Sequence, residues 1–110
     1  MKELFEIAGT DLRVKIPSDL DHPVSDQIRK ESDRIMESIY IRRMIFDFSE
    51  TVFMDSSGIG MIIGRYKTMI TRGGCVSASG LRPPVDRLFH LAGLHRIIAI
   101  DKTEGWEIHE

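Results

Sequence analysis

This sequence offers no disulfide, no membrane-spanning segment and no signal peptide. Cysteine occurs once, as Cys75, so no disulfide can form within the chain and a reducing compartment fits. No stretch approaches the ~20 consecutive apolar residues that cross a bilayer. The segment Met1–Leu4 contains an acidic residue and no uninterrupted apolar run, unlike a secretory signal. We therefore expect a cytoplasmic protein that does not enter the membrane.

An excess of charge of one sign is also missing. The formal net charge is -2, whereas a surface that binds nucleic acid gathers Lys and Arg on one face, so we expect no nucleic-acid partner. The four histidines are scattered, with no pair at the spacing of metal ligands, which predicts neither a metal site nor a cofactor. Cys75 lies in a strand-like segment, where we expect a buried, unreactive thiol.

What the chain does contain is enough apolar material for one core. Its 110 residues are 42% hydrophobic, which suffices for a single domain over residues 1–110 without disulfides or metal. Only the tail, residues 103–110, is weakly specified, because Gly105 interrupts it and its apolar residues are Trp106 and Ile108 alone. We expect this domain to be a monomer.

Two periodicities predict the secondary structure. Leu12, Val14 and Ile16 alternate with polar residues, as in a strand with one face in water, and a short strand at 4–7 precedes them across a turn. Helical spacing of apolar residues and the placement of Pro and Gly predict the rest. These further elements are a helix opened by Pro23, a strand at 44–48, a helix at 56–70, a strand at 75–79, a helix from Pro84 to a stop at Gly93, and a strand at 97–100.

The order of these elements, β-β-α-β-α-β-α-β, predicts the fold class. A strand–helix–strand unit requires parallel neighbours joined by a right-handed crossover, whereas the opening hairpin is antiparallel. We therefore expect an α/β domain with a mixed sheet of four or five strands and helices mainly on one face.

The most informative segment is Thr51–Gly60, in which Asp55, Ser56 and Ser57 follow an apolar strand and open a helix. Side-chain oxygens at this position satisfy the free N–H groups of the first turn, and an anion is favoured there by the helix dipole. One capping residue is enough, and three stand together. Capping alone and a binding site at the C-terminal edge of the sheet both fit this pattern.

The helix that follows has a second unusual feature. Its predicted buried stripe is Ile59, Ile62, Ile63, Tyr66, Met69 and Ile70. Gly60, Met61 and Gly64 fall off this stripe, although each interior glycine costs ~1 kcal/mol relative to alanine. We interpret Gly60, Met61 and Gly64 as a flat strip for a partner, with Met61 exposed in the free domain. We expect Arg65 and Arg82 on the surface, with a possible contact to the partner.

The segment Phe53–Gly60, continued by Gly64–Lys67, resembles the signature of STAS-domain anti-sigma factor antagonists, and most closely those of the sporulation sigma-F operons of spore-forming bacteria. The resemblance extends through Gly73-Gly74, Pro84–Phe89 and Leu91–Leu94, and covers roughly Asp19 to Ile100.

This resemblance implies a function that the composition does not reveal. Ser56 matches the phosphorylated serine of the family, and Asp21 matches an aspartate that lies near it. Family members bind an anti-sigma factor that is also a GHKL-type serine kinase, and thereby release a sigma factor. Phosphorylation ends the binding, and a PP2C-type phosphatase restores it. The implied contact residues here are Asp21, Asp55, Ser57, Gly58, Gly60, Met61, Gly64 and Arg65.

Three alternatives remain beside this prediction. A STAS domain can also serve as an interaction module of another signalling or transport assembly. A phosphoaspartate receiver domain would use Asp55 and Lys102, but it needs an acidic pair after its first strand, where this chain has a hairpin turn. A hydrolytic triad of Ser56, His22 and Asp21 lacks a glycine-flanked nucleophile elbow. We therefore expect a regulatory protein without enzymatic activity, with Asp21, Asp55, Ser56 and Arg82 at one end of the domain.

Overall fold

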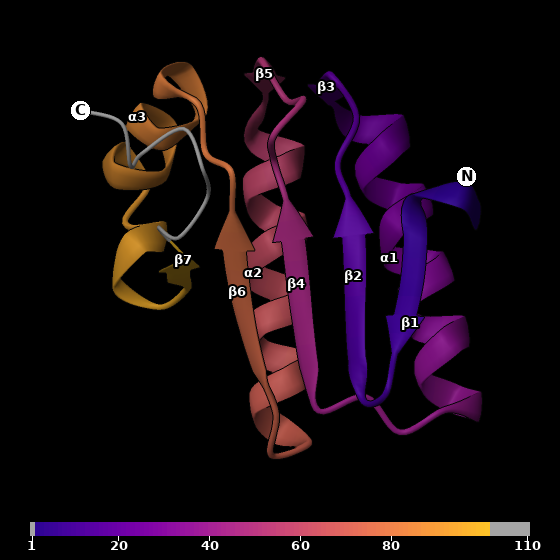
Figure 1. The fold of residues 1–110 in the computed structure, drawn as a ribbon. Helices are drawn as coiled ribbons and strands as arrows, with labels where there is room; N and C mark the ends of the chain where they lie inside the picture. The colour runs from indigo at the N-terminus through magenta and orange to yellow at the C-terminus, as the bar shows by residue number, and fades with distance from the viewer. Residues whose placement is uncertain (1, 102–110) are drawn as a thin grey trace.

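The computed structural model describes residues 2–101, which form one α/β domain on a mixed five-stranded sheet (Figure 1). The strand order is β1-β2-β4-β6-β7. Only β1 and β2 pair antiparallel, and the other neighbours are parallel. The predicted mixed sheet is confirmed. The strands are β1 (Phe5–Ala8), β2 (Asp11–Lys15), β4 (Arg43–Asp47), β6 (Cys75–Ser79) and β7 (Ala99–Asp101).

Helices α1 (His22–Ser38) and α2 (Ser56–Thr71) lie side by side on one face of the sheet, which confirms the predicted layering (Figure 1). Helix α3 (Pro83–Leu91) follows β6 and lies at the end of the sheet where the parallel strands finish (Figure 1). It stops where Gly93 adopts φ 77°, a left-handed conformation that favours glycine, as predicted. Single turns of 3-10 helix occupy Lys2–Leu4 and Leu94–Arg96.

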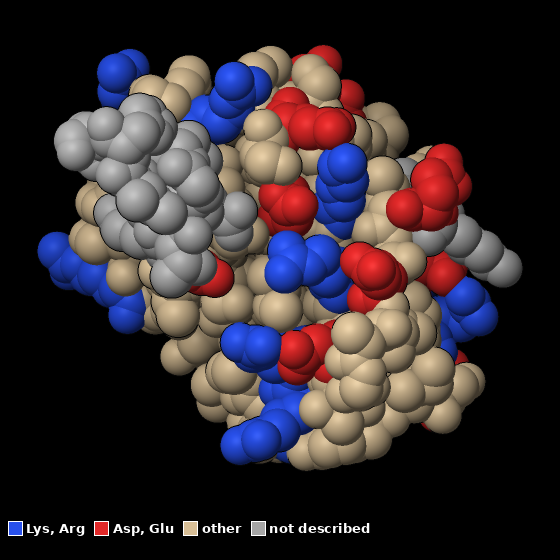
Figure 2. All heavy atoms as spheres, viewed as in Figure 1, with Lys and Arg blue, Asp and Glu red and all other residues tan. Residues whose placement is uncertain are grey.

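The sheet separates an apolar face from a charged one, because successive side chains of a strand point to opposite sides. Leu12, Val14 and Phe46 are fully buried under the helices. On the opposite face, basic and acidic side chains alternate (Figure 2), as in the ion pair of Arg43 with Asp11 at 2.7 Å. The hydrogen bond from Arg43 lowers the pKa of Asp11. The open face is therefore a mixed-charge surface.

The prediction that Cys75 is buried is wrong, because its side chain is exposed. Cys75 is the first residue of β6 and pairs in register with Arg43, so it belongs to the face that no helix covers. Val76 and Ala78, which point to the other side, are the residues of this strand that enter the core. In so short a strand, the alternation of residues does not reveal which of its two faces is covered by helices.

Two very short strands were not predicted, and they position the candidate site. Strand β3 (Asp19–Leu20) pairs parallel with β5 (Phe53–Met54), with Leu20 opposite Met54. Each strand has two residues, too few for a periodic signal. This small second sheet leads directly into α1 and α2.

The contact between α1 and α2 contains a buried cation, which corrects the prediction that Arg65 lies on the surface. The Arg65 side chain is only 6% exposed. It donates hydrogen bonds to the Ser32 hydroxyl at 3.0 Å and to the Asp33 carboxylate at 2.6 Å, both on α1. The apolar stripe of α2 predicts that one side of the helix contacts the sheet. It does not predict that α2 also packs along α1, which buries a second side of α2.

Removing Asp33 should reduce the free energy of unfolding more than removing Arg65. Asp33→Ala leaves the buried Arg65 charge without its anion and should reduce the free energy of unfolding by about 2 kcal/mol or more. Arg65→Met leaves only Asp33, which is 43% exposed and stays hydrated, and should cost under about 1 kcal/mol. Urea unfolding measures both. Asp26→Ala, which removes exposed ion pairs on the same helix, is the control. Equal losses of unfolding free energy in Asp33→Ala and Arg65→Met would contradict the assignment of Arg65 as a buried charge that needs Asp33.

Candidate functional site

The candidate site is formed where two strand-to-helix junctions lie side by side. Because β3 and β5 pair in parallel register, Asp21 and Asp55 follow them at the same level. The Asp55 backbone N–H also donates to the Leu20 carbonyl at 3.2 Å. Helices α1 and α2 therefore begin next to each other, and the sequence-predicted Asp21, Asp55 and Ser56 come together at one end of the domain.

Both aspartates cap their own helices. The Asp21 carboxylate accepts a hydrogen bond from the Val24 N–H at 3.2 Å. The Asp55 carboxylate accepts from the N–H groups of Ser57 at 2.9 Å and Gly58 at 3.2 Å. These bonds stabilise the first turns, where backbone N–H groups otherwise lack partners. Asp55 is thus the cap of α2, and Ser57, considered above as a capping residue, is not.

The two serines after Asp55 differ in environment. Ser56 is exposed at the first position of α2, and no residue among 2–101 hydrogen-bonds its hydroxyl. Ser57 is half-buried, and its hydroxyl lies 3.3 Å from Nδ1 of His22, the first residue of α1. A hydrogen bond therefore links the two helix N-termini and leaves the Ser56 hydroxyl available for reaction or for a partner.

A shallow groove runs between the two first turns. Its walls include His22, Asp26 and Arg29 from α1 and Ser57 and Gly60 from α2. Gly60 stands one helical turn after Ser56 and therefore on the same side of α2, which places Ser56 at the rim. The charged side chains Arg29 and Asp26 are paired with each other at 2.7 Å.

The glycines of α2 have different roles. A Cβ on Gly58 would approach the Met54 side chain to 2.7 Å and the Leu20 side chain to 2.8 Å, so Gly58 is needed where α2 packs on β3 and β5. A Cβ on Gly60 or Gly64 would meet nothing within 4 Å. Internal packing explains Gly58 but not the other two, which remain available to a partner.

The prediction that Met61 is exposed is wrong. It is 6% exposed and belongs to the core cluster, together with Ile62 and Met69 of the same helix. Ile70, predicted to be buried, is 50% exposed. The buried stripe is rotated toward α1 because that helix covers one side of α2. Met61 and Arg65 are therefore structural in the free domain, and the outward strip consists of Gly60 and Gly64.

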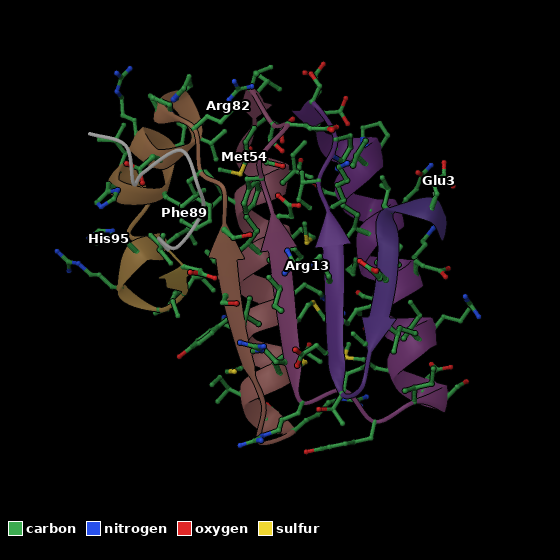
Figure 3. All side chains as sticks on the ribbon, in the orientation of Figure 1. Glu3, Arg13, Met54, Arg82, Phe89 and His95 are labelled. Atoms are coloured by element: carbon green, nitrogen blue, oxygen red, sulfur yellow. The ribbon has the colours of Figure 1, made fainter. Side chains whose placement is uncertain are left out.

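Exposed apolar residues do occur at the site, although sequence analysis did not select them. Val52 is 51% exposed and Phe53 is 49% exposed, just before Asp55. Arg82 is the N-cap residue of α3, which contacts β5, so it lies at the same end of the domain, as predicted (Figure 3).

His22 is the site residue whose role the sequence analysis missed. The sequence analysis considered it only as a member of a hydrolytic triad, and it could not foresee the contact with Ser57, which lies 35 positions away. Elsewhere in the domain, the rings of His90 and His95 stack with their centroids 4.2 Å apart, which the sequence analysis also did not predict. Within residues 2–101, no three His, Cys, Asp or Glu side chains gather as a metal site, and none of the helices described is long and apolar enough to span a bilayer.

Comparison with known proteins identifies relatives of the whole domain. Residues 4–105 match the STAS domain. The anti-sigma F factor antagonist of Paenibacillus polymyxa is 36% identical over 93 residues, which cover 84% of this chain and 80% of that protein. The solved structure of the unphosphorylated anti-sigma factor antagonist SpoIIAA has a TM-score of 0.80 at 24% identity, covering 90% of this chain and 87% of that one.

The fold is also shared with a phosphorylated protein. The phosphorylated form of the Bacillus cell fate determinant SpoIIAA has a TM-score of 0.73 at 23% identity, covering 90% of each chain. At this identity the two solved structures establish the fold alone, which is the one described above.

Alanine at positions 58 and 60 should have opposite effects on stability. Gly58→Ala forces Met54 and Leu20 to move and should cost about 1–3 kcal/mol. Gly60→Ala removes the helix penalty of glycine without a clash and should add about 0.5–1 kcal/mol. Thermal unfolding followed by circular dichroism measures both. A loss of stability in Gly60→Ala would show that this glycine is required inside the domain.

Truncation at Met61 should behave as a core substitution. Met61→Ala should cost about 2–3 kcal/mol, because it removes a buried side chain and leaves a cavity. Phe53→Ala, at a half-exposed position beside the same site, is the control and should cost under about 1 kcal/mol. If urea unfolding ranks the two in the opposite order, Met61 does not have the structural role assigned here.

Proposed function

The chain belongs to the STAS domain family, and we propose that it is an anti-sigma factor antagonist that is switched off by phosphorylation of Ser56. In its unphosphorylated form it binds an anti-sigma factor that is also a GHKL-type serine kinase, and this binding frees the sigma factor. The kinase phosphorylates Ser56, and a PP2C-type phosphatase reverses the reaction. Such a regulator works in the cytoplasm, and we assign it no enzymatic activity of its own.

One observation carries the choice of Ser56. Its hydroxyl is exposed at the start of α2, beside the groove, whereas that of Ser57 is engaged with His22. A kinase active site has to enclose the acceptor hydroxyl. Ser56 is accessible to it because Gly60, one turn further along α2, has no side chain and open space beside it. The similarity to an anti-sigma F factor antagonist at 36% identity supports the proposed role in sigma-factor control. The phosphorylated SpoIIAA structure has the same fold, which supports the proposal that this fold tolerates a phosphate.

The contact surface that we propose differs from the strip expected from sequence. Ser56, Gly60 and Gly64 remain in it, and the exposed Val52 and Phe53 supply most of the apolar contact area, since Met61 is only 6% exposed. Asp21, Asp55 and Gly58 act indirectly, because capping and packing hold the first turns of α1 and α2 in place. An apolar partner surface opposite Ser56 tolerates a neutral hydroxyl but not a phosphate of charge -1.5 to -2.

The alternatives have less support. A receiver-type domain needs a free phosphoacceptor carboxylate, but that of Asp55 is committed to two backbone N–H groups. A STAS interaction module of another signalling or transport assembly would use the same surface. It predicts partner binding that does not depend on phosphate at Ser56.

Serine-to-alanine substitutions test the acceptor. After incubation with ATP and the anti-sigma factor kinase, Ser56→Ala should take up no phosphate, because the reacting hydroxyl is gone. Ser57→Ala should still be labelled at Ser56 and should remain folded, since Asp55 provides the cap. Mass spectrometry of the digested products locates the phosphate. Modification of Ser57 in the wild-type protein, with Ser56 unmodified, would overturn the assignment.

A fixed charge tests the switch. Ser56→Asp should bind the anti-sigma factor at least about tenfold more weakly, because an unpaired charge at a desolvated interface costs several kcal/mol and each 1.4 kcal/mol is a factor of ten. Ser38→Asp adds the same charge at an exposed position at the other end of α1 and should bind like the wild type. Isothermal titration calorimetry compares them, and equal affinities for all three proteins would favour the simple interaction module.

A further inference from the structure

A phosphate on Ser56 would find the three N–H groups that follow it in α2 already occupied. In α2, the N–H groups of Ser57 and Gly58 bond to the Asp55 carboxylate, and that of Ile59 bonds to the Asp55 carbonyl. In the neighbouring first turn of α1, the N–H groups of Val24 and Ser25 likewise donate to Asp21. The helix N-termini that usually stabilise an anion are therefore largely satisfied internally.

The charged side chains around the groove leave few cations for this phosphate. Arg29 is bound to Asp26, which also pairs with Lys30 at 3.1 Å. Asp21 and Asp55 add negative charge at the two caps, and the first turn of α2 carries no basic residue. A phosphate dianion here consequently needs a partner that can acquire a positive charge.

His22 has this property and the appropriate position. Its ring reaches across from α1 to α2 and lies 3.3 Å from the hydroxyl of Ser57, the residue next to Ser56. The side chain is exposed, and the bond to a serine hydroxyl is a weak one that can be exchanged. Imidazole is the one side chain that gains a proton near neutral pH without special surroundings.

We propose that His22 is the intramolecular counter-ion of phosphorylated Ser56: the ring exchanges its bond to Ser57 for the phosphate and is held protonated by it. This inference rests on the proposed phosphorylation of Ser56. The proton comes from solvent, and no covalent bond changes. By linkage, the phosphate favours the protonated ring and the protonated ring favours the phosphate dianion to the same extent. His22 is thus a positioning residue that orients the phosphate.

The test installs phosphoserine at position 56 during translation, so no kinase is needed. A ³¹P NMR titration then measures the pH at which the phosphate becomes a dianion. In the otherwise wild-type protein this midpoint should be about half a pH unit lower than in the His22→Gln variant, because a cation nearby favours the dianion. His22→Lys, which keeps a positive charge, should restore the low midpoint.

Two further variants test whether an arginine, instead of His22, is the counter-ion of the phosphate. Arg29→Gln and Arg82→Gln each remove another basic side chain at this end of the domain, and each should leave the midpoint within about 0.2 pH units of the wild type. An unchanged midpoint in His22→Gln, or a larger shift in either arginine variant, would overturn the proposal. Failure of the proposed function is separate, since it would show as an unmodified Ser56 in the kinase reaction while the titration still reports on His22.

Discussion

The parallel pairing of two very short strands fixes the geometry on which the site depends. Leu20 lies opposite Met54, so the aspartates that follow are level and each begins a helix at the same height. Gly58 allows α2 to approach this pair closely, since any side chain there would meet Met54 and Leu20. Without this register Ser56, Ser57 and His22 would not share one surface.

Stability and recognition are divided between two sides of α2. The side toward α1 and the sheet contains Met61, Ile62 and the buried Arg65, which is anchored to Ser32 and Asp33. The outer side presents Ser56, Gly60 and Gly64, none of which supports internal packing through a side chain. A charge added at Ser56 therefore acts at the surface, while the contacts that hold the domain together lie behind it. This separation is what a phosphorylation switch requires, because the fold has to survive both states.

The sequence by itself determined the order of the three helices and of the strands of the main sheet, and it singled out the segment that carries the candidate site. Alternation in 11–16 required a strand with one wet face, and the Asp-Ser-Ser-Gly segment after an apolar strand required a polar helix start. Local chemistry was sufficient for these conclusions, because capping and periodicity act within a few residues. The resemblance carried by the same segment then indicated the family.

Tertiary structure alone decided which sides of the elements are covered and which distant residues meet. Met61 and Ile70 were misplaced because helical periodicity reports an apolar stripe but not a second helix alongside it, and Cys75 because a short strand does not reveal its covered face. The burial of Arg65 and the bond from His22 to Ser57 join positions 32 to 35 residues apart. Such contacts depend on how the chain returns through space, and no local pattern encodes them.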